Sequence, residues 1–318
     1  MLQLLARPLL LALLLISGTP IAQSDPLVTV ESVIVGNAGN RADQQTGYGA
    51  IAYEYRIGKY HVTIEQYVAF LNAKAAVPPN KVIEDLWIAD MADPKGKEKP
   101  GALITRAGAG TLVNPYRYEV VVSSFWGVQS GKRPVCWVSW FDAARFANWM
   151  HNGAMANSDT ETGAYDLPNY MSEGIVSKNA GARWWIPTED EWYKAAYFDP
   201  TVPAGGGYYR YATRSNTVPT LAAPPGPPNS ANFNNIMSIK GNVLTPVGAY
   251  TQSPSYYGTF DQGGNLWQWT DGVYEENRIV RGGSFSHGLT PLLKTIRRDY
   301  APGFYRDDDT GFRLAGLK

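Results

Sequence analysis

Glycine and proline interrupt this chain at such short intervals that few long helices are expected. The 318 residues include 32 glycines and 22 prolines, together with 10 tryptophans and 20 tyrosines. Glycine and proline favour turns, whereas aromatic rings bury large areas and pack against one another. The sequence therefore predicts a compact fold that is rich in loops and held together by ring packing.

Three short helices are predicted from one local signature, the capping box. In this motif a Ser or Thr side chain accepts a hydrogen bond from a backbone N–H three residues later, where a second polar side chain can reach back. The motif occurs at residues 63–66, 139–142 and 188–191. After the second box, one helical face is apolar at positions Ala143, Phe146, Ala147 and Met150.

Alternating apolar residues predict strands over residues 27–35 and 53–60. Residues 75–132 are irregular and resemble an insertion on the same core. The proline-rich stretch at 224–228 is expected to be a surface loop, because the residues after it contain no helix pattern of their own. We therefore expect one domain over residues 25–318.

Residues 1–24 are predicted to be a signal peptide. Arg7 supplies a positive charge, residues 9–16 are apolar, and residues 22–24 offer a site with small residues for cleavage. The protein is therefore expected to be exported, to the periplasm or the cell exterior, with no membrane association beyond this segment. The 28 basic and 28 acidic residues balance, which argues against a nucleic-acid partner.

Cys136 is the single cysteine, so no internal disulfide can form. It lies in the apolar stretch 134–138, which predicts a buried strand. A small core residue is the favoured interpretation over a nucleophile, because the stretch around it is apolar.

Six segments in order resemble the formylglycine-generating enzyme, or sulfatase-modifying factor, family. They are residues 55–63 (YRIGKYHVT), 134–143 (PVCWVSWFDA), 185–192 (WIPTEDEW), 263–269 (GGNLWQW), 281–285 (RGGSF) and 311–313 (GFR). The resemblance implies a C-type-lectin-like α+β fold, with short helices and small antiparallel sheets. It also implies that Arg281 and Arg313 tie the core by hydrogen bonds.

The family's oxidase holds Cu(I) between two thiolates, and soft sulfur ligands suit that ion. The resemblance places these two positions at His287 and Leu292. A leucine cannot bind a metal, so copper and the family's oxidation of a sulfatase cysteine are not expected. Ser284, His287 and Trp267 remain candidates for residues that line the inherited cleft.

Calcium is the metal that the resemblance favours, in a structural role. Residue-by-residue matching gives a first set comprising Asp261, Gly264, Leu266 and Gln268, in which Gln268 stands where the family has a glutamate. A second set matches only at Asn232 and Phe233. The acidic run 307–309 lacks the spacing of a calcium loop and is expected to be a solvated turn.

Three functions remain open at this point. The first is a binding or accessory module for a peptide, protein or carbohydrate ligand, whose groove Trp267, Trp269 and Phe285 would line. The second is a divergent metal-dependent enzyme, an oxidoreductase, that uses His287. The third is formylglycine generation itself. No Ser–His–Asp arrangement is apparent from the sequence.

Overall fold

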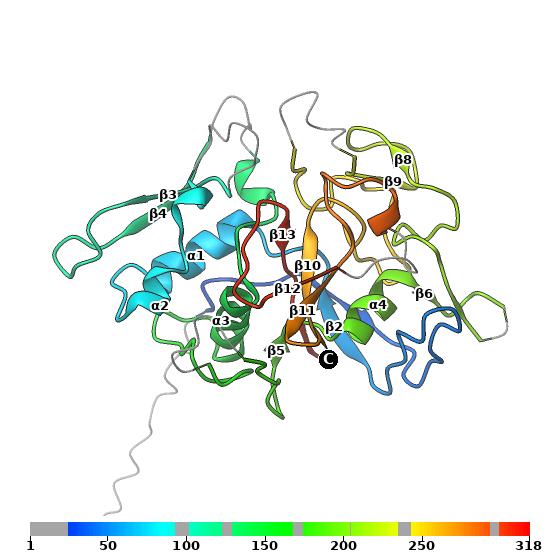
Figure 1. Cartoon of the computed structure of the whole chain (residues 1–318), viewed down its shortest axis with the longest axis horizontal. Helices are drawn as coiled ribbons and strands as arrows, with labels where there is room; N and C mark the ends of the chain where they lie inside the picture. Colours follow the sequence, from blue (N-terminus) through cyan, green and yellow to red (C-terminus); the bar gives the residue numbers. More distant parts are fainter. Residues whose placement is uncertain are drawn as a thin grey trace, which may run out of the picture.

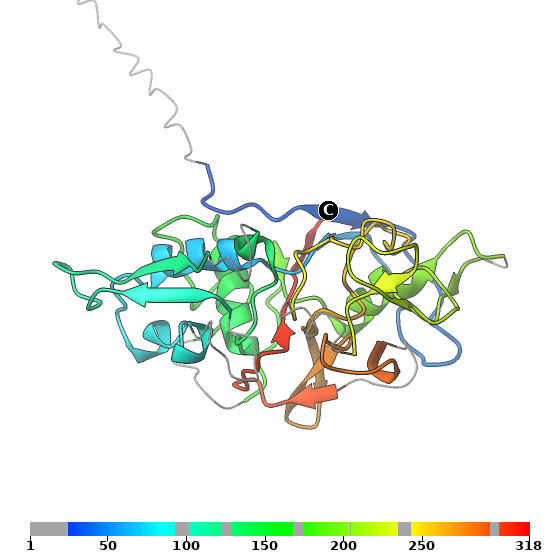
Figure 2. The ribbon, with the colours of Figure 1, turned by 90° about the horizontal axis from the view of Figure 1, so that it is seen from above.

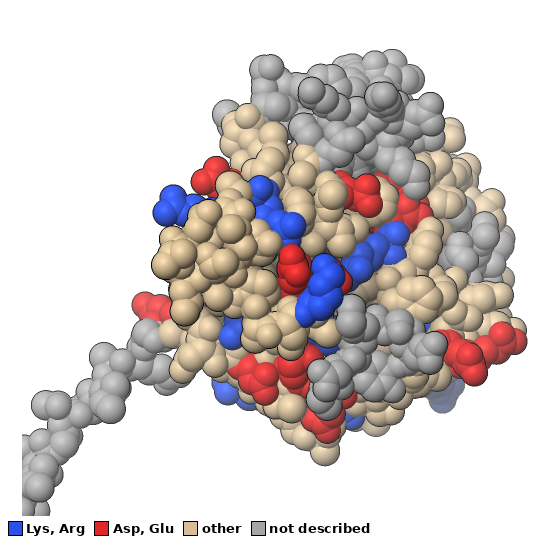
Figure 3. Space-filling model, turned by 60° about the vertical axis from the view of Figure 1, so that its left-hand side comes forward, with Lys and Arg blue, Asp and Glu red and all other residues tan. Residues whose placement is uncertain are grey.

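The computed structural model describes residues 25–92, 102–122, 129–167, 174–203, 205–234, 243–292 and 299–318. The predicted signal peptide lies outside these residues. Within them, every helix is too short or too polar to cross a bilayer. Basic and acidic side chains lie next to one another on the face drawn in Figure 3.

The helices are short, and each predicted capping box begins one. They are α1 (Ile64–Lys74), α3 (Trp140–His151) and α4 (Glu189–Tyr197), and in each box both reciprocal hydrogen bonds are present. The other helical segments have three or four residues: α2 (Lys81–Glu84) and the 3₁₀ turns η1 (Ala89–Met91), η2 (Ser130–Lys132) and η4 (Thr290–Leu292).

Two four-stranded sheets meet near the middle of the molecule (Figure 1). The first is antiparallel, in the order β1 (Ser32–Val35), β2 (Tyr55–Gly58), β14 (Ala315–Leu317) and β5 (Trp184–Trp185). The second has the order β12 (Asp299–Ala301), β11 (Asn277–Arg281), β10 (Trp267–Tyr274) and β13 (Thr310–Gly311), with β13 parallel to β10.

Three two-stranded sheets complete the fold. They are β3 (Ile104–Ala107) with β4 (Arg117–Val120), β6 (Phe198–Asp199) with β7 (Gly207–Tyr208), and β8 (Thr220–Leu221) with β9 (Ser230–Ala231). The β3–β4 hairpin extends at one end of the molecule beside α1 (Figures 1 and 2). The insertion predicted at 75–132 thus has secondary structure of its own.

Aromatic rings fill the core, as the composition predicts. Phe146 of α3 packs edge-on against Phe70, Trp149 and Phe312, with ring centroids 5.3–5.7 Å apart. Two buried arginines tie distant segments together. Arg281 donates to the Glu189 carboxylate, and Arg313 donates to the carbonyl oxygens of Gly58, Lys59 and Phe260.

Two strand predictions differ from the structure. The strand predicted at 27–35 begins only at Ser32. The stretch 134–138 is buried for the most part but forms no strand, because Trp137 has φ 60° and its N–H donates to the carbonyl of Asp307. An extended strand cannot include that left-handed conformation.

Candidate functional site

The candidate site forms where the chain leaves β11 in a tight glycine turn. Gly282 and Gly283 have φ values of 104° and 72°, which side chains disfavour. A Cβ added to Gly282 would lie 2.6 Å from the carbonyl oxygen of Gln262. The turn therefore needs glycine, and it places Ser284 under the loop that carries His287.

Ser284, His287 and Asp309 meet in one hydrogen-bonded cluster. Ser284 Oγ lies 2.8 Å from Asp309 Oδ2 and 2.7 Å from His287 Nδ1. Asp309 Oδ2 also lies 3.4 Å from His287 Nδ1. Ser286 Oγ joins the cluster, 3.0 Å from Ser284 Oγ.

The direction of these hydrogen bonds indicates that Nδ1 of His287 carries a proton. Ser284 donates its one proton to Asp309, so its oxygen accepts from Nδ1–H of His287. In the neutral form of this ring, Nε2 is then the acceptor. Burial raises the pKa of Asp309, while the hydrogen bond from Ser284 acts in the opposite direction.

His287 lines a cavity of about 340 Å³ whose walls are aromatic and acidic. Trp267 meets the His287 ring edge-on, with centroids 5.3 Å apart. One carboxylate oxygen from each of Asp307, Asp308 and Asp309 lies within 4.8 Å of the others. The described residues that line the cavity include no Lys or Arg: Trp267, Trp269, Val280, His287, Tyr300, Ala301, Pro302, Tyr305, Asp307, Asp309 and Thr310.

Two predictions about this region were wrong. Asp309 does not lie in a solvated turn, because its exposed fraction is 9% and it accepts from Ser284. A Ser–His–Asp cluster also exists, although Asp309 lies 25 residues beyond Ser284 in the chain. Its geometry does not fit a serine nucleophile, because Ser284 has an exposed fraction of 0% and donates to the carboxylate, not to the imidazole.

The two positions that correspond to the copper thiolates have different surroundings. His287 lies in the cleft, but Leu292 is buried in a small cluster with Tyr211, Ala231 and Phe233. The thiol of Cys136 is fully buried, and burial raises its pKa well above the usual value. Cys136 is therefore a core residue, in agreement with its predicted role.

Two side chains of the first calcium set, Gln268 and Asp261, are already engaged in hydrogen bonds. Gln268 Oε1 accepts from Trp192 Nε1 at 2.8 Å and from Arg313 Nε at 2.6 Å, while Gln268 Nε2 donates to the carbonyl of Asp261 at 3.0 Å. Asp261 Oδ2 accepts from the backbone N–H of Gly248. A buried guanidinium thus lies beside Gln268 where a cation would bind, and calcium binding by this set stays a prediction.

The second calcium set is incomplete among the described residues. Asn232 Oδ1 is buried without a hydrogen-bond partner, as is Thr245 Oγ1. The side chain of Phe233 packs against Leu292 and offers no ligand beyond its backbone. Calcium binding here stays a prediction, since this ion takes six to eight oxygen ligands.

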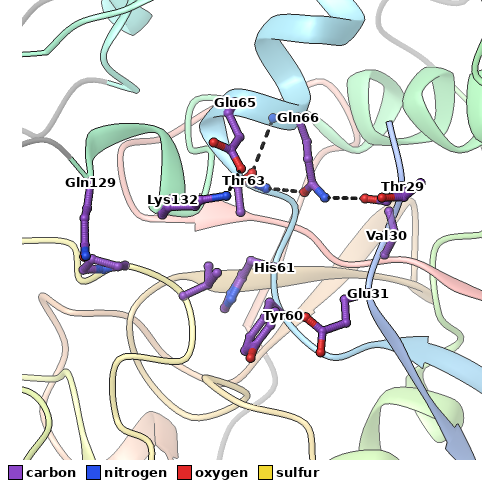
Figure 4. A pocket seen from close by; sticks show the side chains of 12 residues that line it. Thr29, Val30, Glu31, Tyr60, His61, Thr63, Glu65, Gln66, Gln129 and Lys132 are labelled. Atoms are coloured by element: carbon purple, nitrogen blue, oxygen red, sulfur yellow. Dashed lines mark hydrogen bonds and ion pairs between the residues drawn. The ribbon is translucent and has the colours of Figure 1, made fainter. Parts of the chain in front are cut away.

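A larger cavity of about 470 Å³ lies between residues 29–31, α1 and η2 and includes His61 (Figure 4). Its polar side chains mostly bond to one another. Lys132 pairs with Glu65, and Gln66 bonds both Thr63 and the carbonyl of Thr29. Lys132, Glu65 and Gln66 are therefore already paired within the cavity and are less available to a ligand.

The solved structure of CarF supports the fold, and two further solved structures are similar at lower scores. CarF superposes with a TM-score of 0.54 at 19% identity, over 91% of this chain and 99% of that chain. Treponema denticola variable protein 1 gives a TM-score of 0.49 at 17% identity, over 94% and 100% of the two chains. PvdO from Pseudomonas aeruginosa gives 0.46 at 18% identity, over 91% and 92%. The fold is α+β and loop-rich, as the resemblance predicts.

A comparison with curated proteins gave no match. A family model, described as the sulfatase-modifying factor enzyme 1-like domain, matches residues 24–317 and thus almost the whole chain. This match covers all six motifs. The chain therefore belongs to the sulfatase-modifying factor enzyme 1-like domain family.

Proposed function

We propose that this protein is an exported binding module, not an oxidase, and that its cleft takes a basic side chain of a peptide or protein ligand. The observation that carries the proposal is the lining of the cleft. Aromatic rings and the carboxylates of Asp307 and Asp309 line it, and no described Lys or Arg does. Such a lining favours a cation, because carboxylates and aromatic faces both attract positive charge.

The His287 cluster supplies a fixed polar contact in the same cleft. Asp309 and Ser284 favour a proton on Nδ1, and in the neutral ring Nε2 can then accept an N–H of the ligand. Trp267 holds the other side of the ring. A preorganised acceptor of this kind loses little freedom when a ligand binds.

Calorimetric titration with two blocked tripeptides tests the proposal. Acetyl-Gly-Lys-Gly-amide should bind at least about tenfold more tightly than the matching Gln peptide, since only the Lys peptide carries the cation. Asp307→Asn should remove most of this difference. The control is Asp90→Asn, at an exposed position in η1 away from the cleft lining, which should leave both affinities unchanged.

His287→Phe separates the two parts of the cleft. It keeps a ring against Trp267 but removes the acceptor, so affinity for the Lys peptide should fall while the Lys-to-Gln preference remains. Equal binding of the two peptides by the unaltered protein would sink the proposal. Binding of a neutral oligosaccharide in their place would assign the cleft to a carbohydrate.

A divergent enzyme is the second candidate, favoured by the unused Nε2 of His287, which could act as a general base. Any hydrolytic or oxidative activity that survived His287→Ala would exclude this role for His287. Formylglycine generation has a direct test. The copper-treated protein should leave a cysteine peptide from a sulfatase unoxidised, because Leu292 cannot supply a thiolate.

A further inference from the structure

A third cavity, on the first sheet, carries two arginines, and the strand register explains its shape. Arg56 in β2 and Trp184 in β5 both pair with Gly316 of the β14 strand between them. Because Gly316 has no side chain, the side chains of Arg56 and Trp184 can approach each other across β14. A Cβ on Gly316 would lie 3.0 Å from both Arg56 Nε and Trp184. The Arg56 guanidinium can therefore lie over the Trp184 ring, with its central carbon 4.1 Å from the ring centroid.

The second arginine, Arg183, lines the same cavity. Neither guanidinium forms an ion pair with a carboxylate of the described residues. Arg56 Nε is buried and has no hydrogen-bond partner. Burial lowers the pKa of Arg56, and the charge of Arg183 lowers it further. Two like charges beside one cavity repel each other, so an anion between them would be stabilised.

The rest of this cavity is largely apolar. It has a volume of about 330 Å³, which is enough for a small molecule. Its apolar lining includes Val28, Val30, Met150 and Ala154. The cavity shares no lining residue with the cleft at His287. An occupant that matches both parts needs a negative head and a short apolar body.

We propose that Arg56 and Arg183 form a second binding site, for a carboxylate carried on a short apolar chain. The planar guanidinium of Arg56 suits the two oxygens of a carboxylate, and Trp184 holds that plane in position. The apolar body of the ligand packs against Val28, Val30 and Met150.

Calorimetric titration of the purified protein at low salt tests this site, with hexanoate as the probe. Hexanamide has nearly the same shape without the charge, and acetate has the charge without the apolar body. Hexanoate should bind at least about tenfold more tightly than either, since a charged hydrogen bond and burial of the chain each contribute that much.

Arg183→Gln is the decisive variant, because Arg183 is exposed and its substitution leaves the core intact. It should weaken hexanoate binding at least about tenfold. Arg56→Gln should do the same, with circular dichroism confirming its fold. The matched control is Arg210→Gln, at another exposed arginine outside the cavity, which should bind hexanoate as the unaltered protein does.

Three results would overturn the proposal. They are the absence of saturable hexanoate binding, equal affinity for hexanoate and either comparison compound, and unchanged affinity in Arg183→Gln. None of them bears on the cleft at His287, whose peptide titration uses a cationic probe.

Discussion

At the scale of single residues, His61 has an environment that should be measurable in solution. Its ring is fully buried, with Nε2 3.3 Å from the carbonyl oxygen of Leu266 and with Nδ1 unpartnered. Burial, and then the positive charge of Arg313, lower the pKa of His61 well below 6.5. The folded protein therefore keeps this imidazole neutral at pH values where the unfolded chain protonates it.

This difference gives stability a definite dependence on pH. Below about pH 6.5 the unfolded state binds one more proton at His61 than the folded state does. The free energy of unfolding should therefore fall by about 1.4 kcal/mol for each unit by which the pH is lowered below this value. His61→Gln should remove this part of the slope, since a Gln amide can still donate to Leu266. Urea unfolding at about pH 7.5 and about pH 5.5 measures both slopes.

The control for His61 is His151→Gln. His151 is only partly buried and accepts from the backbone N–H of Arg183, so its substitution should change the slope less. Equal slopes in the unaltered protein and in His61→Gln would mean that the folded state accommodates a charged His61.

The cleft residues show what sequence can and cannot predict at this scale. Ser284 and His287 were found because motifs fix their positions three residues apart. Asp309 was missed, since nothing local marks an aspartate 25 residues beyond Ser284 as its partner. Arg56 and Arg183 were also missed, because only the pairing of both strands with Gly316 brings Arg56 over Trp184. Local patterns identify a residue type, whereas tertiary contacts assign its partner.

At the scale of elements, the helix starts were predictable because a capping box is a contact within four residues. The stretch 134–138 was not, since its left-handed residue, Trp137, depends on a hydrogen bond to Asp307 far along the chain. The α3 cap joins both kinds of contact. Asp142 accepts from the Ser139 N–H and pairs with both Nε and Nη2 of Arg306.

This double role predicts unequal costs for two substitutions in one cap. Ser139→Ala removes only the local bond and should lower the free energy of unfolding by about 1 kcal/mol. Asp142→Ala also leaves Arg306 without its carboxylate, so the loss should be about 3 kcal/mol. Urea unfolding compares them. The control is Thr63→Ala, in the α1 cap without such an ion pair, which should lose about as much stability as Ser139→Ala. Equal losses of stability in Ser139→Ala and Asp142→Ala would contradict the stabilising role of Arg306.

At the scale of the whole molecule, the last residues of the chain close the fold. The β14 strand lies between β2 and β5, and β13 pairs with β10. The β14 pairings join segments more than a hundred residues apart, so hydrophobic pattern alone could not predict them. The family resemblance did predict the α+β class, because its six motifs span both sheets.

Long-range contacts also surround Gln268. It accepts a hydrogen bond from Trp192 of α4 and another from Arg313 in the C-terminal segment.

Gln268 should decide whether this junction depends on calcium. Its Nε2 donates to the Asp261 carbonyl, so the amide already supplies the positive partner that this oxygen needs. In Gln268→Glu a carboxylate oxygen would face that carbonyl, which should cost about 1–3 kcal/mol unless a cation lies between them.

Thermal unfolding with EGTA and with added Ca²⁺ measures this dependence. The midpoint of Gln268→Glu should rise with Ca²⁺, because a ligand that binds only the folded state stabilises it. In the unaltered protein, any shift of the midpoint with Ca²⁺ should be the same in Gln268→Ala. If it does respond, and Gln268→Ala abolishes the response, then these oxygens bind calcium and the Arg313 guanidinium does not replace the cation at this junction.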